Sequence, residues 1–133
     1  MKKFILSILA ITLLTTAVSA QKSNFYAVVV SFNSMCCGVP DNAPVMELVK
    51  NFKKQNRIKR MAVDNIGPMG KEGEYYLAFR LKELNKAQRL KFIQQLKKIA
   101  PTMVDKGSVE IKTDLVVNRA DLSPRIVITT QNL

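Results

Sequence analysis

The sequence predicts an α+β domain in which two helices cover one face of an antiparallel sheet. Residues 24–32 form a continuous run of aromatic and β-branched residues, which is typical of a buried strand. Two later segments repeat apolar residues at helical spacing, and the segments around them have the composition of strands. The length is sufficient for one domain with a single core that needs neither a metal nor a disulfide.

The N-terminus has the three parts of a cleavable secretory signal. Two lysines near its start precede an apolar run over residues 4–14, and small residues follow at 18–20. The apolar run is short for a bilayer span. We therefore expect cleavage after Ala20 and a mature domain of residues 21–133 in a periplasm or outside the cell. An uncleaved N-terminal anchor is the alternative.

The first helix is expected after the loop that follows residues 24–32. Asp41 or Asn42 can cap it, and Pro44 is tolerated in its first turn. Its apolar residues recur at i, i+3, i+4 and i+7, so they share one face that can lie on a sheet. These residues are Val45, Leu48, Val49 and Phe52.

Two strands are predicted next, at residues 57–66 and 74–81, joined by a loop with three glycines and a proline. In the second of them, alternation places Leu77, Phe79 and Leu81 on one face, which should meet the helices. The opposite face takes Tyr76, Ala78 and Arg80.

The second helix begins at Asn85, which can form a capping box with Gln88, and ends at Pro101. Its apolar stripe consists of Phe92, Ile93, Leu96, Ile99 and Ala100. Residues 108–117 alternate as a strand, and residues 125–131 could add an edge strand. The order strand, helix, strand, strand, helix, strand is that of a ferredoxin-like βαββαβ sandwich.

No catalytic constellation is visible in the sequence. The absence of histidine excludes serine–histidine and cysteine–histidine catalysis and every histidine metal site. The ten carboxylates are scattered, mostly on expected helix surfaces or loops, without a pair placed for acid–base catalysis. We therefore do not expect an enzyme.

The two cysteines of the chain, Cys36 and Cys37, are adjacent in the loop between the first strand and the first helix. Neighbouring Cα atoms lie about 3.8 Å apart, below the usual disulfide range of about 4.4–6.8 Å, so a bond between them would be strained and easily reduced. Four interpretations remain open. They are a vicinal disulfide or dithiol with a redox or ligand-sensing role, capture of a soft metal, an intermolecular disulfide that forms a homodimer, and a structural role in the core.

The metal interpretation names Cu(I) or Zn as the ion, because thiolates suit both. Met35 beside the cysteines could add a thioether ligand, as could Met69 if the glycine-rich loop folded close to them. The position of the pair resembles that in heavy-metal-associated domains, where a G-M-x-C-x-x-C motif lies in the loop between the first strand and helix. Here the corresponding residues, 34–38, are Ser-Met-Cys-Cys-Gly, without the two-residue spacer. The resemblance implies a soft-metal site in this loop.

The chain is strongly basic. Removal of the signal takes away Lys2 and Lys3, which leaves 19 basic and 10 acidic residues and a net charge of +9. Such a charge favours anionic partners, which for an exported protein are an envelope surface rather than nucleic acid. Simple solubility of the helix faces is the alternative explanation. The candidate surface-binding residues are Lys50, Lys53, Lys54, Lys91 and Lys98.

These features predict an exported small binding protein whose cysteine loop captures a soft metal or ligand or senses redox state. The alternative is a non-catalytic interaction module, with incidental cysteines, that binds a partner protein or an anionic envelope surface through its sheet or its lysines.

Overall fold

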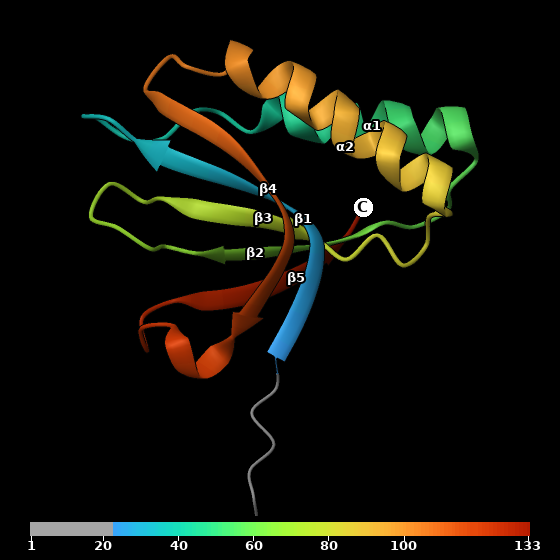
Figure 1. Ribbon diagram of the computed structural model, residues 1–133. Helices are drawn as coiled ribbons and strands as arrows, with labels where there is room; N and C mark the ends of the chain where they lie inside the picture. Colours follow the sequence, from blue (N-terminus) through green and yellow to red (C-terminus); the bar gives the residue numbers. More distant parts are fainter. Residues whose placement is uncertain (1–22) are drawn as a thin grey trace, which may run out of the picture.

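Residues 23–133 are described by the computed structural model, which contains two helices and a five-stranded antiparallel sheet (Figure 1). This architecture confirms the predicted α+β class. The signal expected over residues 1–20 lies outside the described residues. Within residues 23–133, no helix combines the length and the apolar character needed to cross a membrane. The elements are β1 (Ser23–Ser34), α1 (Ala43–Asn56), β2 (Ala62–Gly67), β3 (Tyr75–Phe79), α2 (Lys86–Ile99), β4 (Gly107–Asn118) and β5 (Val127–Asn132), with 3-10 turns at Ala100–Thr102 and Arg119–Asp121.

The sheet has the strand order β4-β1-β3-β2-β5. Because β4 and β5 lie at opposite edges, the segment 119–126 between them has to cross the sheet. It crosses on the face opposite the helices, where Leu122 and Ile126 pack against β-strand residues. In Figure 1 the helices lie above the sheet and this connection lies below it. The C-terminal segment joins the sheet as β5, paired with β2 from Gly67–Val127 to Ala62–Asn132.

Both helices begin near the predicted residues. Asn42 occupies the N-cap of α1 without a side-chain hydrogen bond, whereas the Asp41 carboxylate accepts one from the Ala43 N–H at 3.1 Å. The capping box of α2 is confirmed: the Gln88 N–H donates to Asn85 Oδ1 at 2.9 Å, and the Asn85 N–H donates to Gln88 Oε1 at 3.0 Å. The first turn of each helix therefore has side-chain acceptors for its free amides.

Strand β2 begins five residues later than predicted. Arg57 closes α1 in the left-handed conformation, with φ 53°, and the Ile58 N–H donates to the Lys53 carbonyl at 2.9 Å. This pattern is a helix C-cap, so the residues directly after α1 cannot extend as a strand. Pairing begins with the backbone hydrogen bonds between Met61 and Leu133 and continues from Ala62 with β5 and from Val63 with β3.

The main core lies between the sheet and the two helices, and the predicted apolar faces of the helices and of β3 meet there. Phe92 of α2 is fully buried, and its ring contacts Phe52 of α1 and Phe79 of β3 edge-on, with centroid distances of 5.1 and 5.4 Å. A smaller apolar cluster fills the opposite face of the sheet. Its buried members are Tyr26, Val29, Ile66, Ala78, Val117 and Ile126.

Candidate functional site

The cysteine loop connects β1 with α1 at one end of the sheet. Its start is held by the Met35 N–H, which donates to the Lys106 carbonyl at 3.2 Å, and its end is held by the capping contact of Asp41. Gly38 has φ +106°, a conformation that side-chain-bearing residues rarely adopt, so the turn after the cysteines requires glycine. Both Cys36 and Cys37 are exposed. The loop therefore presents the thiols to solvent between two fixed ends.

The two thiols face each other. Both cysteines are free, and their Sγ atoms share a hydrogen-bonded contact of 2.8 Å. This contact raises the pKa of Cys36, and desolvation and the negative charge of Glu72 add smaller effects in the same direction. The thiolate is the form of cysteine that binds metals and acts as a nucleophile. A metal that binds at Cys36 must therefore displace the thiol proton, which the contact with Cys37 helps to retain.

The structure separates the two methionines considered as ligands. Met35 is 76% exposed and directly precedes the cysteines. Met69 is half-buried, packs against the cluster on the far face of the sheet, and is held by a 2.7 Å hydrogen bond from its N–H to the Glu74 carbonyl. Met35 is therefore the thioether available beside the thiols. Over residues 23–133, no three His, Cys, Asp or Glu side chains are grouped so that they could hold a metal ion.

Beneath the start of α1, the rings of Phe32 and Tyr75 stack with a centroid distance of 4.6 Å and an interplanar angle of 8°. Burial is the main cause that raises the pKa of Tyr75, while a hydrogen bond with Asn42 acts in the opposite direction. Tyr76 belongs to the opposite face of the sheet. The adjacent residues Tyr75 and Tyr76 therefore pack in different cores, one on each face of the sheet.

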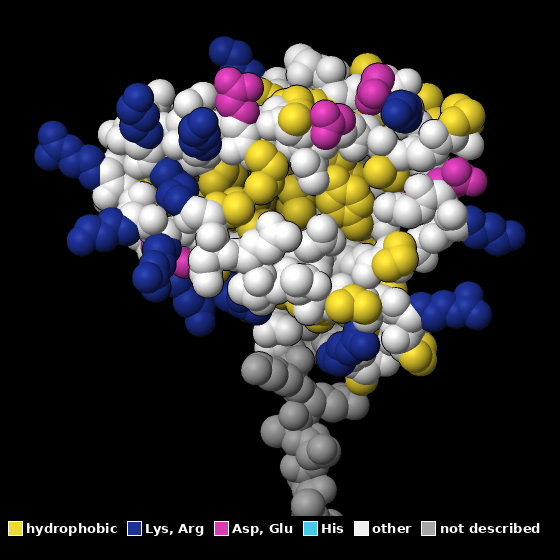
Figure 2. Space-filling view, turned by 180° about the vertical axis from the view of Figure 1, so that it is seen from behind, with side chains coloured by type: hydrophobic (Ala, Val, Ile, Leu, Met, Phe, Trp, Pro, Cys, Tyr) yellow, Lys and Arg dark blue, Asp and Glu magenta, His cyan; other side chains and the backbone are white. Residues whose placement is uncertain are grey.

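The five candidate lysines lie on the two helices, three on α1 and two on α2. Lys50 and Lys53 line a groove of about 200 Å³ together with apolar side chains of α1 and the C-terminal residue. Lys98 lines a different hollow, between the two helices, and Lys54 and Lys91 are exposed. Figure 2 shows an apolar hollow in the middle of one face, with Lys and Arg gathered at one side. The apolar side chains of the groove beside Lys50 and Lys53 are Met46, Val49 and Leu133.

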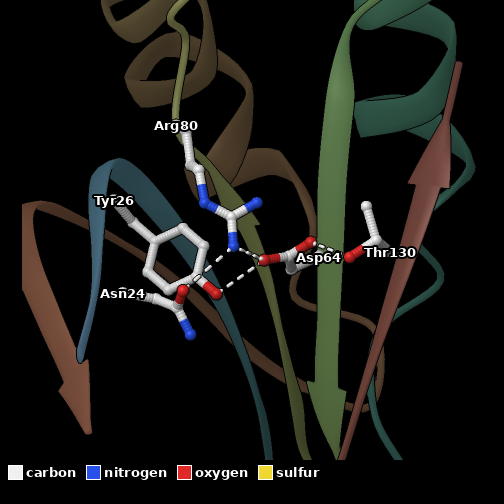
Figure 3. A network of polar contacts seen from close by, with 5 residues as sticks. All are labelled: Asn24, Tyr26, Asp64, Arg80 and Thr130. Atoms are coloured by element: carbon white, nitrogen blue, oxygen red, sulfur yellow. Dashed lines mark hydrogen bonds and ion pairs between the residues drawn. The ribbon is translucent and has the colours of Figure 1, made fainter. Parts of the chain in front are cut away.

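A buried polar cluster was not expected from the sequence, which suggested that the carboxylates lie mostly at the surface. Asp64 of β2 is completely buried. Its Oδ2 accepts a 2.6 Å hydrogen bond from the Tyr26 hydroxyl and lies 2.6 Å from Nη2 of Arg80. Its Oδ1 accepts a 2.6 Å hydrogen bond from the Thr130 hydroxyl, and Arg80 also donates to Asn24 at 3.3 Å (Figure 3).

Through one carboxylate, this Asp64 cluster joins strands β1, β2 and β5 with Arg80, which directly follows β3. The Arg80 guanidinium lies 5.1 Å from the centre of the Tyr26 ring, which adds a cation–π contact. Burial, followed by the hydrogen bond and the charge of Asp64, raises the pKa of Tyr26. Each carboxylate oxygen has a partner, so the cluster is a structural link between strands. An acidic residue inside a predicted strand, with Arg80 predicted on one face of the next strand, was the signal that could have revealed it.

Comparison with protein-family models, with curated protein sequences and with solved structures found no match to this chain. The features of this chain that bear on function are therefore the chemistry of the cysteine loop and the surfaces around it.

Proposed function

We propose that this protein is an exported binding protein whose cysteine loop captures a soft metal ion of the Cu(I) type. The observation that carries the proposal is the contact of two exposed thiols, with 2.8 Å between their Sγ atoms. Thiolate and thioether sulfurs select Cu(I) among the available ions. Met35, exposed beside the pair, supplies the thioether.

Cu(I) suits this loop better than Zn. Structural zinc sites almost always have four protein ligands, and catalytic ones have three. The described part of the chain offers two cysteines and no further Asp or Glu grouped with them as ligands. An ion that needs only two or three sulfur ligands can be held by this loop without a ligand from another part of the protein.

The electrostatics of the loop imply a pH dependence for capture. Because the contact with Cys37 raises the pKa of Cys36, acid conditions keep the Cys36 thiol protonated and oppose binding. Capture should therefore strengthen as the pH rises from acidic to mildly alkaline values. It should also release protons to the solvent.

Native mass spectrometry of the reduced, exported protein with Cu(I) under anaerobic conditions tests the proposal. We expect one Cu(I) per wild-type chain and none on Cys36→Ser/Cys37→Ser. Met35→Leu should weaken retention against a competing chelator by at least about tenfold, the lower end of the effect seen when a group that only supports a metal ligand is lost. Met69→Leu is the matched control and should bind as the wild type does.

Two results would reject the metal site. One is equal Cu(I) uptake by the wild type and the double serine variant, and the other is no uptake by either. Stoichiometric binding of Zn in preference to Cu(I) would mean that the loop is a metal site for Zn and not for Cu(I).

The fold that holds the loop is, we infer, of the ferredoxin-like type. The first four strands of the chain follow the order β4-β1-β3-β2 in the sheet, the elements succeed one another as βαββαβ, and β5 is added beside β2. This supports the split βαβ arrangement, in which the loop between the first strand and first helix lies at one end of the sheet.

A second candidate function is binding of an anionic partner through the groove beside α1. The specific observation in its favour is that Lys50 and Lys53 border an apolar floor formed by Met46, Val49 and Leu133. Such a groove fits a ligand with both an apolar and a negatively charged part. Lys50→Glu/Lys53→Glu should abolish retention on anionic vesicles, whereas the cysteine variants should leave it unchanged. Retention that added salt does not reduce would contradict this second function.

A further inference from the structure

The outer side of strand β5 is a free sheet edge. Within residues 23–133, β5 pairs with β2 alone and is the last strand of the sheet. The pairing is regular over six residue pairs, from Ala62–Asn132 to Gly67–Val127. An edge of this kind presents a row of backbone donors and acceptors that another strand can bind.

The pairing identifies which backbone groups point outward. Met61 and Leu133 exchange both hydrogen bonds, with N···O distances of 3.1 and 3.0 Å. In an antiparallel ladder such pairs alternate with pairs that exchange none. Counting back in the fixed register, Gln131, Thr129 and Val127 also direct their backbone groups to β2. The N–H and C=O groups of Ile128, Thr130 and Asn132 therefore point away from the sheet.

The two edges of the sheet differ in how they are protected. Strand β5, with the sequence VITTQN, contains no charged residue, proline or glycine. Edge strand β4 carries Glu110, Lys112 and Asp114. Asp114 also has φ 55°, and no pairing with β1 forms between Ala27 and Asp114, so the outline of this edge is interrupted. Charges and local irregularities are the usual means of keeping an edge from pairing, and β5 has neither.

We infer that β5 pairs antiparallel with β5 of a second copy of this chain, which joins the two sheets into one. The choice of a second copy follows from self-complementarity. A two-fold axis at Thr130 places Ile128 opposite Asn132 of the other strand and uses only the outward backbone groups. Because the strand is uncharged, no like charges within β5 face each other across the axis.

Pairing of this kind would complete a larger surface. Val127, Thr129 and Gln131 line a hollow of about 340 Å³ on the helix side of β5, together with Tyr75. The groove bordered by Lys50 and Lys53 lies against the same end of the chain, at Leu133. In the dimer, the hollows of the two copies would lie side by side across the paired strands, with one α1 helix along each side.

Sedimentation of the exported protein with reductant tests this inference without interference from a disulfide-linked dimer. We expect a dimer for the wild type and equally for Cys36→Ser/Cys37→Ser. Thr129→Lys/Gln131→Lys should be monomeric, because the added lysines oppose each other across the axis. Thr129→Glu/Gln131→Glu should also be monomeric, and an equimolar mixture of the two variants should recover the dimer. Thr113→Lys on β4 is the matched control and should stay dimeric.

Unfolding midpoints within a few degrees of the wild type verify that the charged variants are folded. A monomeric wild type at high micromolar concentration overturns the inference, as does a dimer that survives the β5 lysines or dissociates with Thr113→Lys. Failure of metal capture leaves these outcomes unaffected, because the cysteines take no part in them.

Discussion

The two faces of the sheet are closed in different ways. The face under α1 and α2 is sealed mainly by apolar contacts, with the rings of Phe52, Phe79 and Phe92 at its centre. The opposite face is covered by the connection 119–126 and contains a charged residue, Asp64, with no exposure at all. The stability of the helix-covered face therefore depends on tight apolar packing. The stability of the opposite face depends on a hydrogen-bond or ion-pair partner for each oxygen of the buried Asp64 carboxylate.

Loss of the arginine on the polar face should have the largest effect. Arg80→Met leaves the Asp64 carboxylate buried without a countercharge, and we expect the free energy of unfolding to fall by about 3–5 kcal/mol. The double variant Asp64→Leu/Arg80→Met should recover a large part of this loss, because no unpaired charge remains. Denaturant unfolding of the three proteins measures both values. Absence of recovery in the double variant would contradict the view that charge satisfaction governs this face.

On the helix-covered face, truncation of a single side chain should lower the free energy of unfolding by a similar or slightly smaller amount. Phe92→Ala removes a fully buried ring and should lower the free energy of unfolding by about 3–5 kcal/mol. Phe25→Ala is the matched control, since that ring is 53% exposed, and it should change stability by less than about 0.5 kcal/mol. Equal losses in the two variants would mean that this core is not organised around Phe92.

The tyrosine of the polar face should produce an effect that depends on pH. At neutral pH, Tyr26→Phe removes a hydrogen bond to a charged group and should cost about 1.5–3 kcal/mol. The pKa of Tyr26 is raised above its ordinary value of 10.0, so the native state favours the protonated form. Its contribution is therefore complete below pH 10 and declines as the pH rises further.

Phenylalanine cannot ionise, so the stability of Tyr26→Phe should fall less steeply above pH 10 than that of the wild type. Urea unfolding at a series of pH values gives both slopes, with Tyr76→Phe as the control on the same face. Parallel slopes for Tyr26→Phe and the wild type would show that Tyr26 is not held protonated by the fold.

The smallest effect is expected at the cysteines, which belong to neither face. Cys36→Ser/Cys37→Ser replaces two exposed side chains and should change the free energy of unfolding by less than about 0.5 kcal/mol. Urea unfolding with and without reductant measures this change. A large destabilisation would assign these cysteines a structural role in place of the proposed binding role.

Much of the fold could be predicted from the sequence because its signals are local. The capping box at Asn85, the alternation in β3 and the stripe centred on Phe92 each depend on neighbours within one or two helical turns. The late start of β2 was missed because the closing turn at Arg57 uses a left-handed conformation that no glycine marks in the sequence. The candidate site was anticipated as a loop, but the separation of Met69 from it depends on how the hairpin packs.

The sequence by itself determined the two helices and most of the strands, which faces are apolar, and that the two cysteines share the loop between the first strand and the first helix. The exposure of the cysteines came from the structure. Only the tertiary structure decided that Asp64 meets Tyr26, Arg80 and Thr130, because these residues come from separate segments and Tyr26 and Thr130 lie 38 and 66 positions from Asp64 along the chain. It also decided that β5 lies beside β2 and that, within residues 23–133, no strand pairs with its outer side. Such pairings depend on which long-range contacts bury the most surface while satisfying every polar group, and no local pattern encodes that balance.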